Sequence, residues 1–515
     1  MNHTLSRRQA LRLAGAVSAA AATPPWLTRE VQAQARDRLV ISYPLDVPSW
    51  DPIAHTFPAA MSIWKTVFDS PLTQSADLRL SPNLITSWRY LTPDGLNLEV
   101  NFRDDVVWHN GDRMTAEDFK FSFEERPKAD TTLAVAGVWN RTLRTIDVVS
   151  PTQAVMRFNS PMPTAAPWLA FLGSYVMPKR YFESVGGKQG FLRAPIGSGP
   201  YKLVEYQQNS RIVLEAFDRY WGGRPRIPRV VFEIVRDPTA RVAAIQSRAA
   251  DIAVQIPIRE ADRLGQVQGL VSRIDPFTEV MLFQIPNTGA MQDKNVRLAA
   301  HHAINKEALS RALFFGRAVP LSVPCTPGTP GYPADFTFPF SEDRARQLLA
   351  ASGFNPQNPA RFKMLTTNGA FPNDFDLARA IQQMWRRVGI EAEIEVIEQA
   401  KYFELNHNGQ LPGPCLYSWA NSTGDPEIYT GYLLHPDLRF SAWKSEDMRT
   451  RLRALFAETN QEARYQGYRE TARYAVEEGY TIPLLQGVST LVHVQGLNYQ
   501  AWGNGWVLPA HQSWA

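Results

Sequence analysis

A strand–helix–strand pattern in the middle of the chain is the feature that most constrains its fold. An apolar stretch at 229–236 has the length and composition of a buried strand. Asp237 follows as a helix-capping residue, Pro238 takes the first helical position, and a second apolar strand lies at 252–256. Two strands joined by a helix usually lie parallel in one sheet, with helices on its faces. The pattern therefore predicts an α/β lobe.

A second pattern of the same kind lies more than a hundred residues downstream. It consists of a short strand at 362–366, an amphipathic helix at 374–388 that Gly389 ends, and a strand at 390–396 in which apolar residues alternate with glutamates. The distance between the two patterns predicts two separate sheets and hence two lobes. Ligands of α/β proteins commonly bind at strand ends or between domains.

The region between residues 80 and 200 has a different character. Residues 88–107 alternate between apolar and polar, and Pro93-Asp94-Gly95 interrupts them as a hairpin turn would. Thr115-Ala116-Glu117-Asp118 resembles a capping box, and 144–158 contains two strands around Ser150-Pro151. We expect a β-rich third domain here.

The first 35 residues have the features of a signal peptide. Arg7, Arg8 and Arg12 precede a mildly apolar, alanine-rich stretch, and small residues end at Ala35 in an A-x-A pattern. The paired arginines before weak hydrophobicity resemble the twin-arginine type of signal, which exports folded proteins. No cysteine lies near the expected cleavage site, so we expect a free periplasmic protein without a lipid anchor.

The composition excludes several classes of protein. The chain has 515 residues, of which 20% are charged and 44% hydrophobic, as in ordinary globular proteins. Two cysteines, Cys325 and Cys415, are too few for a disulfide scaffold or a four-cysteine zinc site, although their number leaves open whether they pair. Three of the four net positive charges lie in the first 35 residues, so the mature chain does not resemble a nucleic-acid-binding protein. No apolar run is long enough to span a membrane.

No catalytic or metal-binding pattern stands out. The nucleophile-elbow, zincin and P-loop motifs are absent. His301 and His302 are adjacent on an expected helix and would point about 100° apart, so they cannot chelate one metal together. Ser198 lies between two glycines in a turn without a strand-to-helix context. We therefore expect no catalytic residues, no metal and no cofactor.

A series of short blocks along the chain resembles one known family. The blocks are Leu45–Pro52, Val67–Leu72, Leu80–Leu84, Phe102–Gly111, Thr115–Phe119, Gly197–Leu203, Tyr220–Pro225, Thr239–Ala244, Val296–Ala300 and Ala303–Lys306. Each block alone is a weak signal, whereas their joint order over about 400 residues is specific. In these blocks the chain resembles the family 5 extracellular solute-binding proteins, the dipeptide, oligopeptide and nickel class of ABC importers.

The resemblance implies a two-lobed periplasmic binding protein of type II, similar to cluster C, with an additional β-rich domain. It implies that the protein captures a peptide or peptide-like solute between the lobes and delivers it to an ABC permease complex in the inner membrane. We expect a monomer. The expected domains are a signal peptide at 1–35, lobe I at 36–58, 190–285 and 488–515, the β-rich domain at 59–189, and lobe II at 286–487.

In the peptide-binding relatives, the block after the last strand of lobe II carries the pocket. Trp419 resembles the family's pocket tryptophan, and its alternative role is core packing. Relatives that bind free peptides have an aspartate three residues later for the α-amine, whereas this chain has Ser422. A hydroxyl supplies a dipole but no charge, so we expect that the ligand does not depend on a free α-amine at this position. Asp425 is the nearest acid and could replace that aspartate or cap the loop.

Three further residues complete the expected site. The resemblance places Asp46 and Val47 on a strand edge beside the ligand, where a peptide backbone can pair with the protein. Asp46 is also a second candidate for the amine. Trp139 could close the pocket from the β-rich domain, or it could be part of that domain's core.

Two alternatives to peptide binding remain open at this stage. The ligand could be a non-peptide solute such as an opine, a sugar derivative or a metal chelate. The chain could also be an exported hydrolase built on a two-lobed scaffold, which would require a nucleophile and a base near the cleft.

Overall fold

The computed structural model describes residues 37–515 except 57, 77–78 and 422, and its centre is one ten-stranded mixed sheet. The expected signal peptide therefore lies outside the described residues. In spatial order the strands are β14 (Ile390–Val396), β13 (Ala360–Thr366), β15 (Cys415–Ala420), β12 (Leu270–Gln284), β16 (Thr481–Val494), β11 (Ile252–Val254), β1 (Arg38–Tyr43), β10 (Arg229–Ile234), β9 (Arg211–Ala216) and β8 (Tyr201–Gln207).

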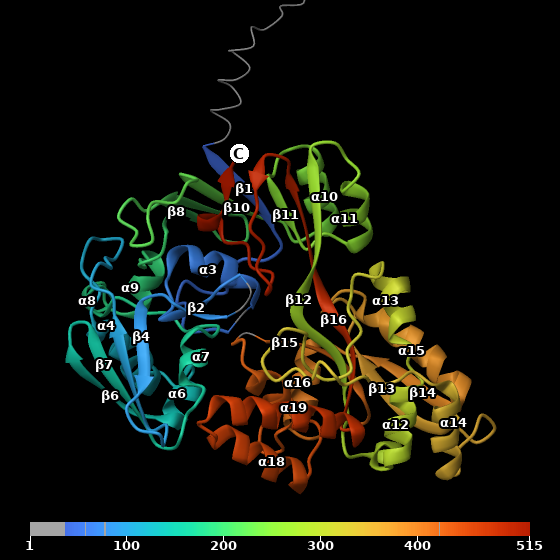
Figure 1. The fold of residues 1–515 in the computed structure, drawn as a ribbon. Coiled ribbons are helices and arrows are strands. Elements are labelled where there is room, and N and C mark those ends of the chain that lie inside the picture. The colour runs from blue at the N-terminus through green and yellow to red at the C-terminus, as the bar shows by residue number, and fades with distance from the viewer. Residues whose placement is uncertain (1–36, 57, 77–78, 422) are drawn as a thin grey trace, which may run out of the picture.

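The prediction of two separate sheets was wrong in one respect, because two long strands join them. β12 and β16 are antiparallel neighbours that run through both halves of the molecule, as Figure 1 shows. Their pairing is irregular between Pro276 and Val280, near the middle of both strands. We call the half that contains β1 and β8–β11 lobe I, and the half that contains β13–β15 lobe II.

The first strand–helix–strand unit is confirmed in lobe I. β10 and β11 both pair parallel with β1, which lies between them. The connecting helix α10 (Pro238–Gln246) begins as the sequence predicts, because the Asp237 carboxylate accepts a 2.7 Å hydrogen bond from the Ala240 amide.

The second unit is confirmed in lobe II. β13 and β14 are parallel, and α15 (Asp374–Val388) connects them. Gly389 ends the helix at φ 103°, a left-handed conformation that an L side chain rarely adopts.

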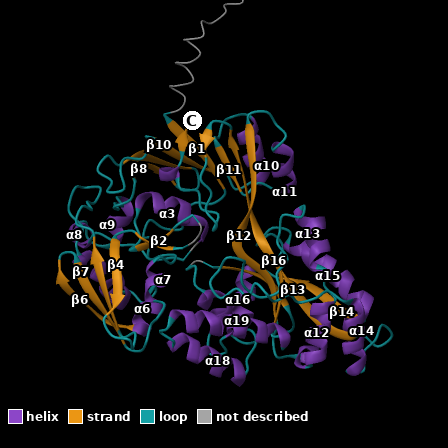
Figure 2. Ribbon diagram, viewed as in Figure 1, coloured by secondary structure: helices purple, strands orange, loops and turns teal. Residues whose placement is uncertain are grey.

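The β-rich region contains a separate antiparallel sheet, visible at the left of Figure 2. Its strand order is β4 (Ile85–Tyr90), β5 (Asn97–Phe102), β7 (Gln153–Phe158) and β6 (Leu143–Ser150). The expected hairpin joins β4 to β5, and the capping box at Thr115 and Asp118 opens α4 (Ala116–Lys120).

The remaining elements cover these sheets or connect them. Two short sheets pair β2 (Leu72–Gln74) with β3 (Leu80–Pro82), and β17 (Leu497–Asn498) with β18 (Ser513–Trp514). The other helices are α3 (Met61–Val67), η2 (Phe121–Glu125), α5 (Arg126–Ala129), α6 (Ala136–Thr142), α7 (Ala165–Leu169), α8 (Lys179–Ser184), α9 (Lys188–Arg193), α11 (Ile258–Leu264), α12 (Lys294–His302), α13 (Lys306–Phe314), α14 (Glu342–Ala351), α16 (Gln399–His407), η4 (Glu427–Gly431), α17 (Tyr432–Leu434), α18 (Glu446–Ala457) and α19 (Gln461–Glu477), with short turns η1 (Pro58–Ala60), η3 (Gly289–Gln292) and η5 (Pro509–His511). Over the described ranges, no helix is both long and apolar enough to cross a membrane.

Several of the sequence blocks meet around one buried carboxylate, that of Asp69. It accepts 3.0 Å hydrogen bonds from the Ser198 hydroxyl and from the indole nitrogen of Trp221. The glycines at 197 and 199 are needed because a Cβ atom there would lie 1.9 Å and 2.6 Å from the backbone of Val67. These blocks therefore hold lobe I against the β-rich domain.

Candidate ligand-binding site

β15 ends at the junction of the two lobes. It pairs with β12 over six residues but with β13 at a single position, Leu365 opposite Cys415. Residues 417–420 are half-buried, although the strand lies inside the sheet. The side chains of this part of β15 are therefore partly accessible to solvent, at the end of lobe II that adjoins lobe I.

Trp419 lies on this half-buried stretch, where the two large apolar clusters of the molecule meet. Its indole nitrogen donates a 2.8 Å hydrogen bond to the backbone oxygen of Ile428, which fixes the ring plane. Its ring meets Phe440 edge-on, with centroids 5.4 Å apart. The side chain packs against the core of lobe II and against the apolar cluster to which Ile428 belongs, which continues into lobe I and the β-rich domain. A rigid aromatic face in this position can bind apolar or planar groups.

The loop after β15 is ordered by its own polar side chains. The Asn421 side-chain oxygen accepts hydrogen bonds from the amides of Thr423 and Gly424, at 3.0 and 2.8 Å. Ser422, the residue on which the sequence-based ligand hypothesis depends, lies outside the described residues. That hypothesis stays a prediction.

Asp425 is part of a buried ion pair. Its two carboxylate oxygens accept hydrogen bonds of 2.8 and 2.5 Å from the guanidinium of Arg464 on α19, and both side chains are at most 5% exposed. Its Oδ1 also accepts a 2.9 Å hydrogen bond from the Glu427 amide. The structure therefore places Asp425 as a charge partner of Arg464 and as a cap of the following turn.

Glu427 joins this ion pair to the β-rich domain. Its Oε2 lies 3.4 Å from Arg464, while its Oε1 accepts hydrogen bonds from Thr164 at 3.2 Å and from the Trp168 indole at 3.5 Å. The Trp168 ring also lies 5.7 Å from that of Tyr432. Burial raises the pKa of Glu427 to about 7, against the opposing effect of Arg464. These contacts form a polar latch between lobe II and the β-rich domain.

Asp46 and Val47 face lobe I. The Asp46 carboxylate accepts hydrogen bonds from the Tyr206 hydroxyl at 3.0 Å, the Asn209 amide at 2.7 Å and the Val47 amide at 2.7 Å. Val47 is 4% exposed. Both residues lie after the end of β1 and not on a strand edge, so that part of the expectation was wrong. The Val47 amide already has an intramolecular partner.

Trp139 lies inside the β-rich domain. It is 1% exposed on α6 and meets Phe123 edge-on at 5.5 Å. The structure brings it together with that domain's core and with none of the other predicted site residues.

One residue at the junction was missed by the sequence analysis, namely Glu279 on β12. Ser418 donates a hydrogen bond from its hydroxyl to the Glu279 carboxylate. Successive side chains of a strand point to opposite faces, so this pair lies on the other face of the sheet from Trp419. Burial raises the pKa of Glu279, and the Ser418 hydrogen bond opposes this. The one available signal was an acid at the start of an otherwise apolar stretch, 280–283.

The described residues contain no group of three histidine, cysteine or acidic side chains that could hold a metal ion. His301 is buried, with its Nε2 2.8 Å from Lys306 Nζ and its ring stacked on Phe338 at 3.6 Å. Cys325 and Cys415 are both buried and free, which answers the question of pairing.

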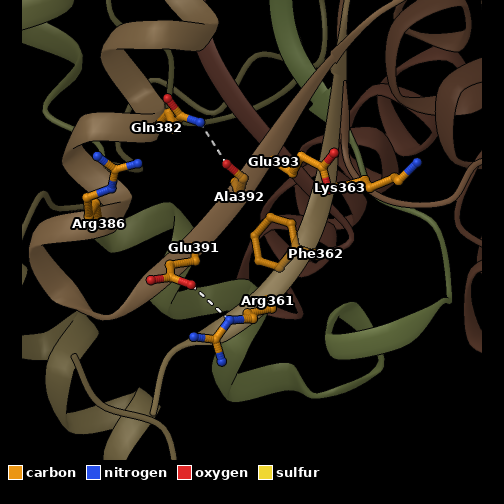
Figure 3. Close-up of a pocket in the computed structure, with 8 residues that line it drawn as sticks. All are labelled: Arg361, Phe362, Lys363, Gln382, Arg386, Glu391, Ala392 and Glu393. Atoms are coloured by element: carbon orange, nitrogen blue, oxygen red, sulfur yellow. Dashed lines mark hydrogen bonds and ion pairs between the residues drawn. The ribbon is translucent and has the colours of Figure 1, made fainter. Parts of the chain in front are cut away.

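A groove of about 510 Å³ lies elsewhere on lobe II, over β13, β14 and α15 (Figure 3). Two of its charged side chains, those of Arg361 and Glu391, pair with each other at 2.8 Å. None of the predicted site residues lines this groove.

Comparisons with known proteins agree with the fold. The model of the bacterial extracellular solute-binding proteins, family 5 Middle, matches residues 79–439. The Dipeptide-binding protein of Escherichia coli (strain K12) is 26% identical over 371 residues, which are 68% of this chain and 69% of that protein. Nickel-binding protein NikA of Staphylococcus aureus (strain NCTC 8325 / PS 47) is 23% identical over 360 residues, 70% of each chain.

The solved structure of the ABC transporter substrate-binding protein CtaP from Listeria monocytogenes superimposes with a TM-score of 0.82. It is 20% identical and covers 93% of this chain and 99% of its own. At 20% identity, the structural similarity establishes the two-lobed fold alone. The family model establishes the family, because it matches well over half of the chain. The chain therefore belongs to the family 5 bacterial extracellular solute-binding proteins.

Proposed function

We propose that this protein is the periplasmic substrate-binding subunit of an ABC importer and captures a peptide or peptide-like solute between its two lobes. The observation that carries the proposal is the position of Trp419, half-buried at the end of β15 and packed against both large apolar clusters, one of which continues into lobe I. A ligand on this ring would contact residues of both lobes at once. The loaded protein would then deliver its solute to a permease complex in the inner membrane.

In this proposal, the hinge lies in β12 and β16. These two strands join the lobes, and their pairing is irregular between Pro276 and Val280. A break in ladder pairing lets the two halves of a strand move with less loss of hydrogen bonds than a regular ladder would. The division into lobe I at 36–58, 190–285 and 488–515, the β-rich domain at 59–189 and lobe II at 286–487 belongs to the same proposal.

A non-peptide solute, such as an opine, a sugar derivative or a metal chelate, is the second candidate. It is favoured by the pairing of Asp425 with Arg464 and by the three hydrogen bonds that Asp46 accepts within lobe I. Neither of these two acids is then available to a free α-amine without losing its present partners.

The experiment that tests the proposed function is native mass spectrometry of protein freshly purified from the periplasm. We expect one small solute per monomer, and removal of that solute should lower the melting temperature. If the protein carries no solute and no member of a panel of peptides, opines and sugar derivatives shifts its melting temperature, the proposed function is wrong.

We also propose export through the twin-arginine route, with cleavage after Ala35, on the basis of the leader sequence. Replacing Arg7 and Arg8 together with lysine keeps the charge but removes the paired arginines. The double variant should remain in the cytoplasm as uncleaved precursor in a fractionation experiment. Undiminished export would contradict the route.

A further inference from the structure

A single helical turn of lobe II, η4, has contacts in three directions. It is a π-helical turn, because the Tyr432 amide donates a hydrogen bond five residues back, to the Glu427 carbonyl. Such turns are rare and occur frequently at functional sites. Three successive residues of η4, namely Glu427, Ile428 and Tyr429, each contact a different part of the molecule.

The first direction is toward the β-rich domain. The Oε1 atom of Glu427 accepts hydrogen bonds from the Thr164 hydroxyl at 3.2 Å and from the Trp168 indole at 3.5 Å. These three side chains are at most 6% exposed. Ile428 is equally buried and belongs to the apolar cluster that continues into the β-rich domain. Polar and apolar groups of η4 therefore meet this domain in a contact that excludes water.

The other two directions are toward the candidate ligand site and toward the hinge. The Ile428 carbonyl accepts the 2.8 Å hydrogen bond of the Trp419 indole. Tyr429 is fully buried, and its hydroxyl donates a 2.9 Å hydrogen bond to the Thr278 carbonyl. Thr278 lies in the stretch of β12 where the pairing with β16 is irregular. A displacement of η4 would therefore disturb both the indole and the hinge strand.

The contact of η4 with the β-rich domain joins two bodies that have separate cores. Lobe I and the β-rich domain share one apolar cluster, whereas lobe II has its own. β12 and β16 run from one body into the other. Because the β-rich domain is fixed to lobe I, a rotation of lobe II that opens the molecule has to separate Glu427 from Thr164.

We propose that η4 is the latch of the closed protein, which holds lobe II against the β-rich domain and couples this contact to Trp419 and to the hinge. The inference rests on the proposed function, because it assumes that the lobes open to admit a solute. A carboxylate oxygen without donors is costly inside a dry contact, whereas water can replace the donors once the lobes open. Glu427 and Thr164 are thus positioning residues, which act on the solute through the equilibrium between open and closed protein.

The turn between α18 and α19 provides a matched control at the same interface. The Thr459 hydroxyl donates a 3.0 Å hydrogen bond to the Pro93 carbonyl in the β4–β5 hairpin. Thr459 is exposed, so water can replace this hydrogen bond in the closed protein as well as in the open one. Thr459→Val therefore removes a threonine hydroxyl from the interface without touching η4.

The experiment compares wild type, Thr164→Val, the double variant Thr164→Val/Trp168→Phe and the control Thr459→Val. Ser87→Cys on β4 and Ala454→Cys on α18 supply exposed sites for spin labels, whose distance reports how far lobe II lies from the β-rich domain. Both native cysteines are buried and therefore protected from labelling.

The distance is measured in solute-free protein and again at saturation with the co-purified solute, identified by mass spectrometry. Stopped-flow fluorescence gives the association and dissociation rates of this solute and of a panel of short peptides. Thermal unfolding verifies that each variant is folded.

We expect Thr164→Val to shift the distances toward longer values, and the double variant to shift them further. Every solute that binds should dissociate about three- to tenfold faster from Thr164→Val, the factor that corresponds to one buried hydrogen bond. Association should not slow, because the latch forms after the solute has entered. A purely structural role of Thr164 would lower the melting temperature without changing the dissociation rate. The control should keep the distances and rates of the wild type.

Two results would overturn the inference and leave the proposed function standing. One is a Thr164→Val variant with the distances and dissociation rates of the wild type. The other is a Thr459→Val variant with effects as large as those of Thr164→Val, because η4 would then have no special role. If wild type binds neither a co-purified solute nor any peptide, the proposed function fails, and the distances in solute-free protein still decide whether η4 holds the two bodies together.

Discussion

Two acids near the lobe junction differ in what compensates their charge. Asp425, in the loop after β15, is held by both nitrogen arms of Arg464 and is removed from solvent. Glu279, on the neighbouring strand, has a serine hydroxyl as its partner and keeps part of its surface exposed. A carboxylate that is paired with a cation within the chain stabilises the fold, whereas one that is partnered by a neutral hydroxyl recovers less of the cost of its burial.

The largest expected effect comes from removing the partner of the satisfied acid. Arg464→Ala leaves Asp425 buried without its cation, and breaking such a pair typically destabilises a protein by about 3–5 kcal/mol. Chemical denaturation should detect this loss in the solute-free protein. The control is Arg473→Ala, which removes an exposed pair with Asp335 and should change the free energy of unfolding by less than about 1 kcal/mol. Equal effects of the two variants would contradict the structural role of Asp425.

Trp419→Ala should have the next largest effect, and this effect should be on the affinity for the solute. We expect the affinity for the co-purified solute to fall by more than about 1 kcal/mol, because a buried aromatic anchor commonly carries that much. Trp88→Phe, on the separate sheet of the β-rich domain, is the control and should leave the affinity unchanged. Calorimetry measures both. Unchanged affinity in Trp419→Ala would leave this tryptophan as part of the scaffold.

The smallest effect concerns Glu427, the acid that connects the ion pair with the β-rich domain. Its pKa rises from 4.5 to about 7 because of burial, so folding favours its protonated form. Its contribution to stability is therefore fully present below about pH 4.5 and is lost as the pH rises to about 7. Glu427→Gln should remove this part of the pH dependence, measured as the difference in unfolding free energy between variant and wild type from pH 4.5 to 8. A difference that does not change with pH would contradict the raised pKa.

Local signals in the sequence predicted much of the fold. Asp237 and Gly389 mark a helix start and a helix end by side-chain chemistry and backbone conformation, and both lie where they were expected. The continuity of the sheet could not be predicted in this way. β12 and β16 are separated by about two hundred residues in the sequence but pair in the sheet. Nothing in the local sequence of either strand indicates which strand it pairs with.

The candidate site was harder to predict for the same reason. Asp425 could be recognised as an acid near the pocket, but its partner Arg464 comes from a helix 39 residues away. Trp139 is a large aromatic residue of the kind that often lines a pocket. Its burial against Phe123 depends on how the β-rich domain folds, which the local sequence does not reveal. Glu279 was missed because a single acid at the start of an apolar stretch is not a motif. Whether an acid has a cationic partner depends on the folded chain, so the different surroundings of Asp425 and Glu279 could not be predicted from the sequence.

The central claim, that a solute binds between the lobes and draws them together, is tested most directly by small-angle X-ray scattering with and without the co-purified solute. A saturating solute should reduce the radius of gyration. It should also raise the stability of the fold by about 2.7 kcal/mol at a hundred times its dissociation constant. An identical scattering profile at a solute concentration that calorimetry shows to be saturating would contradict closure around a ligand at the lobe junction.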